Sequence, residues 1–225
     1  MSLLEQPLGK LARQIPGATA VFYRHQLDFC CGGNKTLRAA ADERGVDAGA
    51  IAAELQNLPS PADGTASDWS NASSGALIEH IVERYHDVHR AQFPELIRLA
   101  FKVEHVHGDR PDCPNGLADH LRAMQQELES HMQKEEQVLF PMLKRGEGAL
   151  ARMPIGVMRI EHDHHGEALR HLADLTDNLT PPRAACTTWR ALYLGLRTLH
   201  EDLMQHIHLE NNVLFENAAR EPANA

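Results

Sequence analysis

The chain has 225 residues, enough for one or two domains with a sizeable hydrophobic core. Its formal net charge is −9, and no run of lysine and arginine stands out, which argues against a nucleic-acid partner. No stretch approaches the ~20 apolar residues that span a bilayer, and the N-terminus lacks the apolar core of a signal peptide. Two of the four cysteines are adjacent and two are isolated, which predicts no disulfide framework. We therefore expect a soluble, cytoplasmic protein with no membrane partner.

Residues 1–58 are predicted to form a small module of short helices. Thr36 and Asp47 are typical N-caps, and each predicts a helix that begins at the next residue. The segment Cys30-Cys31-Gly32-Gly33-Asn34 interrupts the helical pattern between these helices and the start of the chain.

Residues 59–75 are rich in proline, glycine and small polar residues, and we expect them to be a linker.

Residues 76–225 show periods near 3.6 and read as four long helices joined by short connections, which predicts an all-α, up-down-up-down four-helix bundle. Pro94 is expected to kink or break the first helix, and Pro141 to distort the last turn of the second. The four helices are expected over about 76–106, 117–144, 154–177 and 188–218.

A segment of the second predicted helix occurs again in the fourth. The segment that starts at His131 returns 75 residues later at His206, and both copies contain His-x-x-x-Glu followed by Val-Leu-Phe. Residues i and i+4 lie on one face of a helix, so His131 and Glu135 point the same way, as do His206 and Glu210.

Each His–Glu pair continues an apolar stripe with three- and four-residue steps, which places the pair in the core. An ionised carboxylate in a core is costly unless it is paired or binds a metal. A lone pair of this kind occurs by chance on surface helices, whereas two in register favour a metal site. The matching stripe residues are Leu121, Met124 and Leu128 before the first pair and Leu196, Leu199 and Leu203 before the second.

The first and third predicted helices supply further histidines. His86 lies 45 residues before His131, and His162 lies 44 residues before His206, so each helix offers a partner to one His–Glu pair. On the first helix the position on the apolar face favours His89, which lies at the centre of the stripe, over His86 at its border. A second inward histidine suits a hydrogen-bonding partner of a ligand.

Four imidazoles and two carboxylates are too many donors for one tetrahedral zinc ion and suit two metal ions with bridging carboxylates. Imidazole and carboxylate donors without thiolate favour iron or manganese over copper(I). The other histidines are expected to be solvated or at the edge of the core: His25, His80, His105, His107, His120, His171, His200 and His208.

Cys30 and Cys31 allow two interpretations. The adjacent glycines can expose the thiols in a loop, and the helix that follows Thr36 would lower their pKa, which favours a reactive or metal-contacting pair. The alternative is two small apolar residues buried in a turn.

Together these residues resemble the iron–sulfur cluster repair di-iron proteins, the repair-of-iron-centres family. The likeness covers nearly the whole chain, and a Cys-Cys-Gly-Gly module joined to a hemerythrin-like bundle is its most specific feature. The motifs that carry it are Gln6-Pro7-Leu8-Gly9, Asp28-Phe29-Cys30-Cys31-Gly32-Gly33, Arg84-Tyr85-His86-Asp87, Ser130-His131 to Phe140-Pro141, Glu161-His162-Asp163, and His206 to Phe215.

The resemblance implies a non-haem di-iron centre in which Glu135 and Glu210 bridge two iron ions. On the first helix it favours His86 over His89. The ligands that it implies are His86, His131, Glu135, His162, His206 and Glu210.

The function that the resemblance implies is the repair of iron–sulfur clusters damaged by nitrosative and oxidative stress, through iron supplied by a labile di-iron centre. The partners would be damaged cluster proteins, with nitric oxide or oxygen acting at the di-iron site and Cys30 and Cys31 as candidate redox or cluster-contacting thiols. The alternatives are a hemerythrin-like carrier or sensor of nitric oxide or oxygen, and a nitric oxide or nitrite reductase. Enzyme activity therefore stays open, as does a homodimer.

Overall fold

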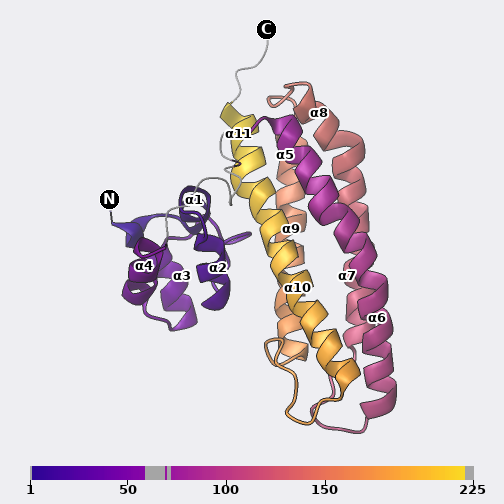
Figure 1. Cartoon of the computed structure of the whole chain (residues 1–225). Helices are drawn as coiled ribbons and strands as arrows, with labels where there is room; N and C mark the ends of the chain where they lie inside the picture. Colours follow the sequence, from indigo (N-terminus) through magenta and orange to yellow (C-terminus); the bar gives the residue numbers. More distant parts are fainter. Residues whose placement is uncertain (1, 59–68, 70–71, 221–225) are drawn as a thin grey trace.

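The computed structural model describes residues 2–58, 69 and 72–220. Within this part of the chain all the regular elements are helices, and a single bridge pairs Pro7 with Thr36. The expected all-α fold is therefore confirmed. The predicted linker, residues 59–75, lies mostly outside the described residues. A small N-terminal module and a long bundle make up the described structure (Figure 1).

Four short helices build the N-terminal module, and the two predicted caps are confirmed. The side chain of Thr36 accepts a hydrogen bond from the backbone N–H of Ala39, and that of Asp47 from Gly49 and Ala50. The apolar faces of the four helices meet in a small core around Phe22. The helices are α1 (Leu8–Gln14), α2 (Ala18–Arg24), α3 (Leu37–Arg44) and α4 (Ala48–Gln56), after the 3-10 turn η1 (Leu3–Glu5).

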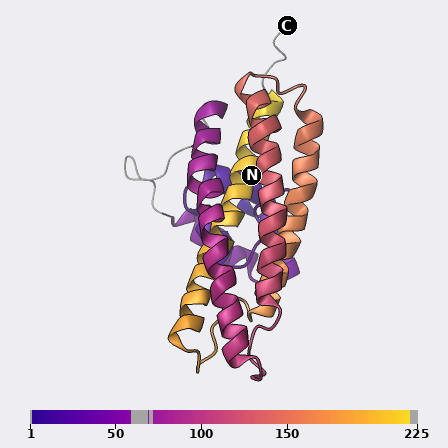
Figure 2. The ribbon, with the colours of Figure 1, turned by 90° about the vertical axis from the view of Figure 1, so that its right-hand side faces the viewer.

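Four antiparallel rods form the bundle, and each packs against two neighbours, as the predicted up-down-up-down order requires (Figures 1 and 2). The rods have the predicted places in the chain. They are α5 (Ser74–Ile81) with η3 (Val82–His86) and α6 (Asp87–His107); α7 (Leu117–Lys134) with η4 (Glu135–Leu139) and α8 (Phe140–Lys144); α9 (Arg152–Leu175); and α10 (Thr187–Leu209) with η5 (Glu210–Leu214) and α11 (Phe215–Arg220).

Three of the rods contain a single π turn: η3, η4 and η5. A π turn spaces hydrogen-bonded residues by five positions, so it rotates the face of the helix that follows. Pro141 lies at the start of α8, directly after η4, where its missing N–H is tolerated. Pro94 lies inside α6, which continues through it, so the break considered at this position does not occur.

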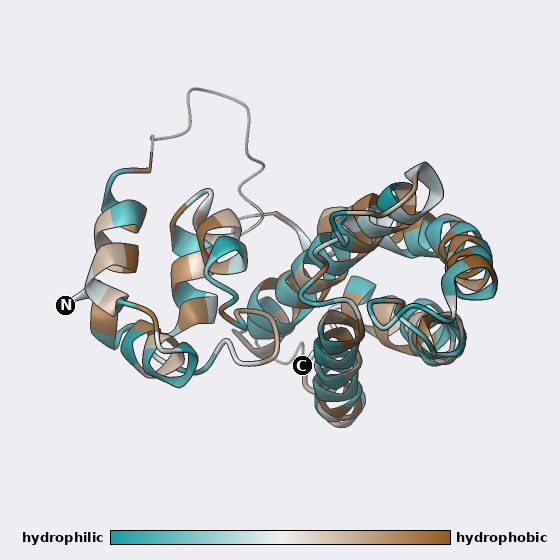
Figure 3. Cartoon of the chain, turned by 90° about the horizontal axis from the view of Figure 1, so that it is seen from below, coloured by the Kyte–Doolittle hydropathy of each residue, from teal (hydrophilic) through white to brown (hydrophobic). Residues whose placement is uncertain are grey.

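Two hydrophobic clusters fill the described part of the chain. One joins the module to the end of the bundle around Trp189, and the other fills the opposite end around Phe215. Viewed along the rods, apolar positions gather between the helices, and the module lies beside the bundle (Figure 3). Neither cluster contains the buried histidine and glutamate side chains, to which all four rods together contribute. Nowhere in the described ranges is a helix long and apolar enough to cross a membrane.

Candidate metal centre

The structure brings the six histidine and glutamate side chains singled out in the sequence into one buried group. His86 ends η3, His131 lies on α7, and His162 lies on α9. His206 lies near the end of α10, and the two glutamates begin π turns. None of the six is more than 1% exposed: His86, His131, Glu135, His162, His206 and Glu210.

The four histidines form two pairs. The Nε2 atoms of His86 and His206 are 3.1 Å apart, and those of His131 and His162 are 3.0 Å apart. Each pair directs two ring nitrogens at one point, as the ligands of one metal ion would.

The two carboxylates lie between these pairs. Glu135 Oε2 is 3.5 Å from the Nε2 atoms of both His86 and His131, one from each pair. Glu210 places Oε1 3.2 Å from His206 Nε2 and Oε2 3.0 Å from His162 Nε2. The group therefore divides into two sets of four that share both glutamates, with ligand atoms of each set within 4.8 Å of one another.

The protonation properties of the group fit cation binding. Neither oxygen of Glu135 has a hydrogen-bond donor within the described residues. Burial and the adjacent Glu210 raise the pKa of Glu135, whereas burial lowers the pKa of His86 to about 2. Burial alone would raise the pKa of Glu210, but the nearby His206 and His162 hold this pKa well below its usual value. Imidazole nitrogens and two crowded carboxyls therefore converge on one buried region, where a metal ion would satisfy them.

A second set of side chains orients the imidazoles. The Nδ1–H of His86 donates to Glu136 at 2.7 Å, and that of His131 donates to Glu161 at 2.9 Å. The Nδ1–H of His162 donates to the side-chain oxygen of Asn211 at 2.9 Å. These bonds fix the tautomer that presents Nε2 to the centre.

His206 is oriented differently. Its Nδ1 has no hydrogen-bond partner in the described structure, and the ring of Tyr85 stacks on it with centroids 5.5 Å apart. Tyr85 and Glu161 occupy equivalent positions, directly before His86 and His162. Tyr85 supports His206 by stacking, whereas Glu161 supports His131 by a hydrogen bond. The two halves of the centre are therefore not equivalent.

The π turns decide which histidine of the first rod joins the group. Because η3 spaces residues by five, His86 lies one turn after Ile81 and faces the centre. His89 is fully buried, with its ring 5.4 Å from that of His206, but it does not belong to either set of ligand atoms. The preference for His89 from face position assumed a uniform α-helix, whereas the structure places His86, not His89, among the grouped ligand atoms.

Sequence reasoning missed the orienting residues, although the repeat contains a signal for two of them. Glu136 and Asn211 are 75 residues apart and follow the two ligand-type glutamates, so they occupy equivalent positions. His208, expected at a solvated edge, is instead 2% exposed and lies edge-on to Phe29.

The loop that contains Cys30 and Cys31 lies directly against this group. The thiol of Cys31 donates to the backbone carbonyl of His162 at 3.1 Å, and the Asn211 amide donates to the carbonyl of Cys30 at 3.1 Å. Asn211 therefore contacts a buried histidine on one side and the cysteine loop on the other.

Asp28 shapes the cysteine loop from within. One of its carboxylate oxygens accepts hydrogen bonds from the backbone N–H groups of Cys31 and Gly32 and from the thiol of Cys30. Both thiols are free, with sulfur atoms 3.6 Å apart. The hydrogen bond with Cys31, burial and the nearby Asp28 raise the pKa of Cys30. The expectation that a helix N-terminus lowers the thiol pKa is therefore wrong for Cys30.

Comparisons with known proteins agree with this arrangement. The family described as Hemerythrin HHE cation binding domain matches residues 77–218, and a family described as a domain of unknown function matches residues 4–59. The chain is 52% identical over 219 residues to the iron-sulfur cluster repair protein YtfE of Citrobacter koseri, covering 97% of this chain and 98% of the relative. It is 52% identical over 220 residues to the protein of that name from Dickeya chrysanthemi, covering 98% and 99%. With the protein of that name from Escherichia coli O1:K1 / APEC it shares 51% identity over 219 residues, covering 97% and 98%. The chain therefore belongs to the family of the iron-sulfur cluster repair proteins and contains a hemerythrin HHE cation binding domain.

Proposed function

We propose that this protein repairs iron–sulfur clusters damaged by nitrosative and oxidative stress, and that it supplies the iron from its own buried centre. The observation that carries the proposal is the contact between the cysteine loop and that centre: the Cys31 thiol lies 3.1 Å from the carbonyl oxygen of His162. A thiol held beside a metal-binding group is suited to contact a cluster that receives the metal. The ligands in this proposal are His86, His131, Glu135, His162, His206 and Glu210.

Two iron ions suit the donor set. The centre offers four imidazoles and two carboxylates, and such donors without thiolate favour iron or manganese. The name of the relatives favours iron between these two. Glu135 and Glu210 would help to hold both ions in this assignment, because each belongs to both sets of ligand atoms. Bound iron would supply redox and Lewis-acid chemistry, while the chain orients the imidazoles and keeps the centre buried.

Of the two cysteines, Cys31 is the better candidate to contact a client cluster. Burial and its neighbours keep Cys30 protonated, whereas Cys31 is partly exposed. Cys31 also lines a polar cleft of about 310 Å³ between the module and the bundle, together with Lys10 and Arg159. This cleft gives the thiol access to solvent and presents positive charge to an anionic cluster.

Iron transfer tests the proposal directly. Iron-loaded protein is mixed with an enzyme whose cluster lacks one iron, and both the recovered activity and the iron that stays with each protein are measured. We expect activity to return as iron leaves this protein. Cys30→Ala with Cys31→Ala should keep the iron but slow the repair.

Two results would replace the proposal by another function. Iron that stays bound while nitric oxide or oxygen binds reversibly would indicate a carrier or sensor. Repeated turnover of nitric oxide or nitrite with a reductant, without iron loss, would indicate a reductase.

A further inference from the structure

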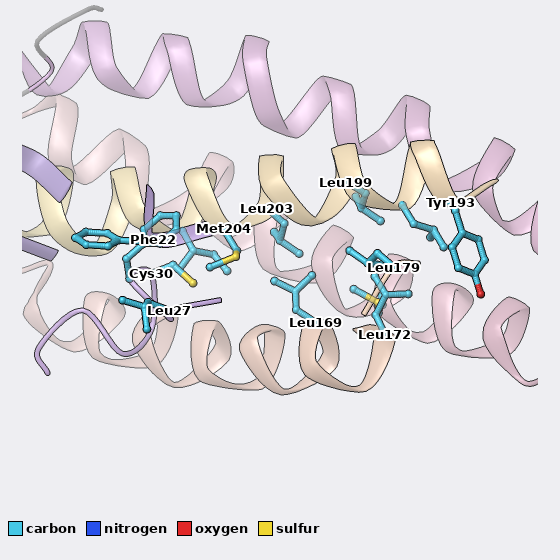
Figure 4. Packing of buried hydrophobic residues seen from close by; sticks show 14 of the residues in the cluster. Phe22, Leu27, Cys30, Leu169, Leu172, Leu179, Tyr193, Leu199, Leu203 and Met204 are labelled. Atoms are coloured by element: carbon cyan, nitrogen blue, oxygen red, sulfur yellow. The ribbon is translucent and has the colours of Figure 1, made fainter. Parts of the chain in front are cut away.

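A second cleft, unrelated to the metal ligands, opens between the module and the bundle. Its volume is about 300 Å³, and its walls come from α2, α3, α9 and α10. The floor is apolar and is formed by Leu27, Cys30, Leu169, Leu179 and Met204. Figure 4 shows Leu27 and Cys30 of the module beside Met204 of α10 and Leu169 of α9.

Four arginines surround this apolar floor: Arg24, Arg44, Arg170 and Arg197. Among the described lining side chains Asp28 is the one acidic residue, and Arg24 pairs with Glu54, so Arg44 and Arg197 supply the uncompensated positive charge of the cleft on a chain of net charge −9.

Arg44, Arg170 and Arg197 retain hydrogen-bonding capacity. Arg44 uses Nε to bond the carbonyl of Gln26, and Arg170 lies 3.8 Å from Asp28, beyond hydrogen-bond distance. Arg197 forms no ion pair with any described residue. A guanidinium has five N–H donors in a planar fork that matches a carboxylate. The cleft therefore combines an apolar surface with free donors for an anion.

We propose that this cleft binds a small amphiphilic carboxylate, with its apolar body on the Leu27–Met204 floor and its carboxylate on Arg170 and Arg197. A volume of about 300 Å³ is at the lower end for small-molecule sites, which are apolar with a few placed polar groups. Since the walls belong to both parts of the chain, the ligand would hold the module against the bundle on the side of Cys30. The inference does not depend on the proposed repair activity.

Calorimetric titration of the iron-loaded protein with octanoate tests the inference. We expect saturable binding of octanoate and none of acetate, which lacks the apolar body, or of octyltrimethylammonium, which has the opposite charge. Arg170→Gln with Arg197→Gln should weaken octanoate binding at least tenfold. Ala173→Leu, which fills the cleft from α9 with a good helix former, should do the same.

Arg152→Gln is the matched control, because Arg152 is an exposed arginine at the other end of α9 and should not affect binding. Hydrogen exchange measured by mass spectrometry should show octanoate protecting residues 169–179 but not 152–160. Absence of saturable octanoate binding, equal binding of the cation, or the same affinity in the cleft variants and the control would overturn the inference.

Discussion

The carboxyl group of Glu135 is fully buried, without a hydrogen-bond donor in the described structure, and it lies beside a second buried carboxyl, that of Glu210. Burial and Glu210 raise its pKa, so the metal-free protein holds Glu135 protonated. A bound cation would remove both the burial penalty of the ionised form and the repulsion between the carboxylates. The stability of the protein should therefore depend on metal through this residue.

Replacing Glu135 by Gln separates these effects. The metal-free variant should be about as stable as the wild type, because a neutral amide replaces a neutral acid of the same shape. At iron concentrations a hundredfold above Kd, each bound ion should add ~2.7 kcal/mol to the stability of the wild type, so two ions raise its melting temperature by roughly 10–20 °C. The variant should gain far less in scanning calorimetry. Glu83→Gln, which changes an exposed carboxylate in η3, should keep the full gain. An undiminished gain in Glu135→Gln would contradict the assignment of Glu135 as a ligand.

Buried histidines make the metal-free protein sensitive to mild acid. Unfolded histidine titrates near pH 6.5, so below that pH the unfolded chain binds more protons and the free energy of unfolding falls with falling pH. Glu135, whose pKa is raised, makes the free energy of unfolding rise with falling pH, but it is one group and the histidines are five. Burial is the largest cause that lowers their pKa values, to about 2 for His86 and His165, about 3 for His89, and about 4 for His200 and His208.

Urea unfolding of the metal-free protein should therefore show a steep loss of stability between pH 6.5 and 4.5. Each histidine that gains its proton only in the unfolded chain lowers the free energy of unfolding by up to ~1.4 kcal/mol for each unit by which the pH falls. His208→Gln should flatten the dependence, whereas His105→Gln, at an exposed position, should leave it unchanged. A free energy of unfolding that is constant from pH 7 to pH 5 would refute this account of the histidines.

At the scale of helices, local signals predicted what local interactions determine. Thr36 and Asp47 were recognisable as caps because one side chain satisfies the first N–H groups of its own helix. The π turns have no such local sequence signal, and a prediction based on a uniform 3.6-residue period does not include them. For this reason the sequence predicted the second and fourth rods and their His–Glu pairs, but the period alone selected His89 instead of His86.

Alanine substitutions of these two histidines test the role of η3. His86→Ala should bind less iron than the wild type, because it removes one Nε2 from the group. His89→Ala should keep the full iron content although it leaves a cavity, because His89 belongs to neither set of ligand atoms. Iron content by elemental analysis after desalting measures both. Full binding by His86→Ala together with loss in His89→Ala would reverse the assignment.

At the scale of the molecule, the module is anchored at the metal-binding group through contacts between residues far apart in the sequence. Cys31 contacts His162, and Asn212 donates to the carbonyl of Phe29 at 3.2 Å. The sequence predicted the module and the bundle separately, since each has its own periodicity. It could not place one on the other, because no local pattern encodes which carbonyl a thiol or amide of another domain will reach.

Gly166 makes this contact testable. A Cβ at Gly166 would lie 3.1 Å from the sulfur of Cys31, whereas one at Gly156 on the same helix would meet nothing within 4 Å. Gly156→Ala should stabilise the protein by ~1 kcal/mol through helix propensity. Gly166→Ala should lose this gain and displace the Cys31 thiol from the carbonyl of His162. The rate of Cys31 alkylation by iodoacetamide, followed by mass spectrometry, should rise severalfold in Gly166→Ala only. Equal alkylation rates in the two variants would show that the contact does not hold the thiol.

The iron content and the Mössbauer spectrum of the loaded protein test the central claim, that the six buried side chains form a di-iron centre. We expect two iron ions per chain in the wild type, with two distinguishable signals because Tyr85 supports His206 where Glu161 supports His131. Glu135→Ala with Glu210→Ala should abolish the coupled pair. Fewer than two iron ions per chain in fully loaded wild type, or an unchanged spectrum in the double variant, would contradict the centre as described.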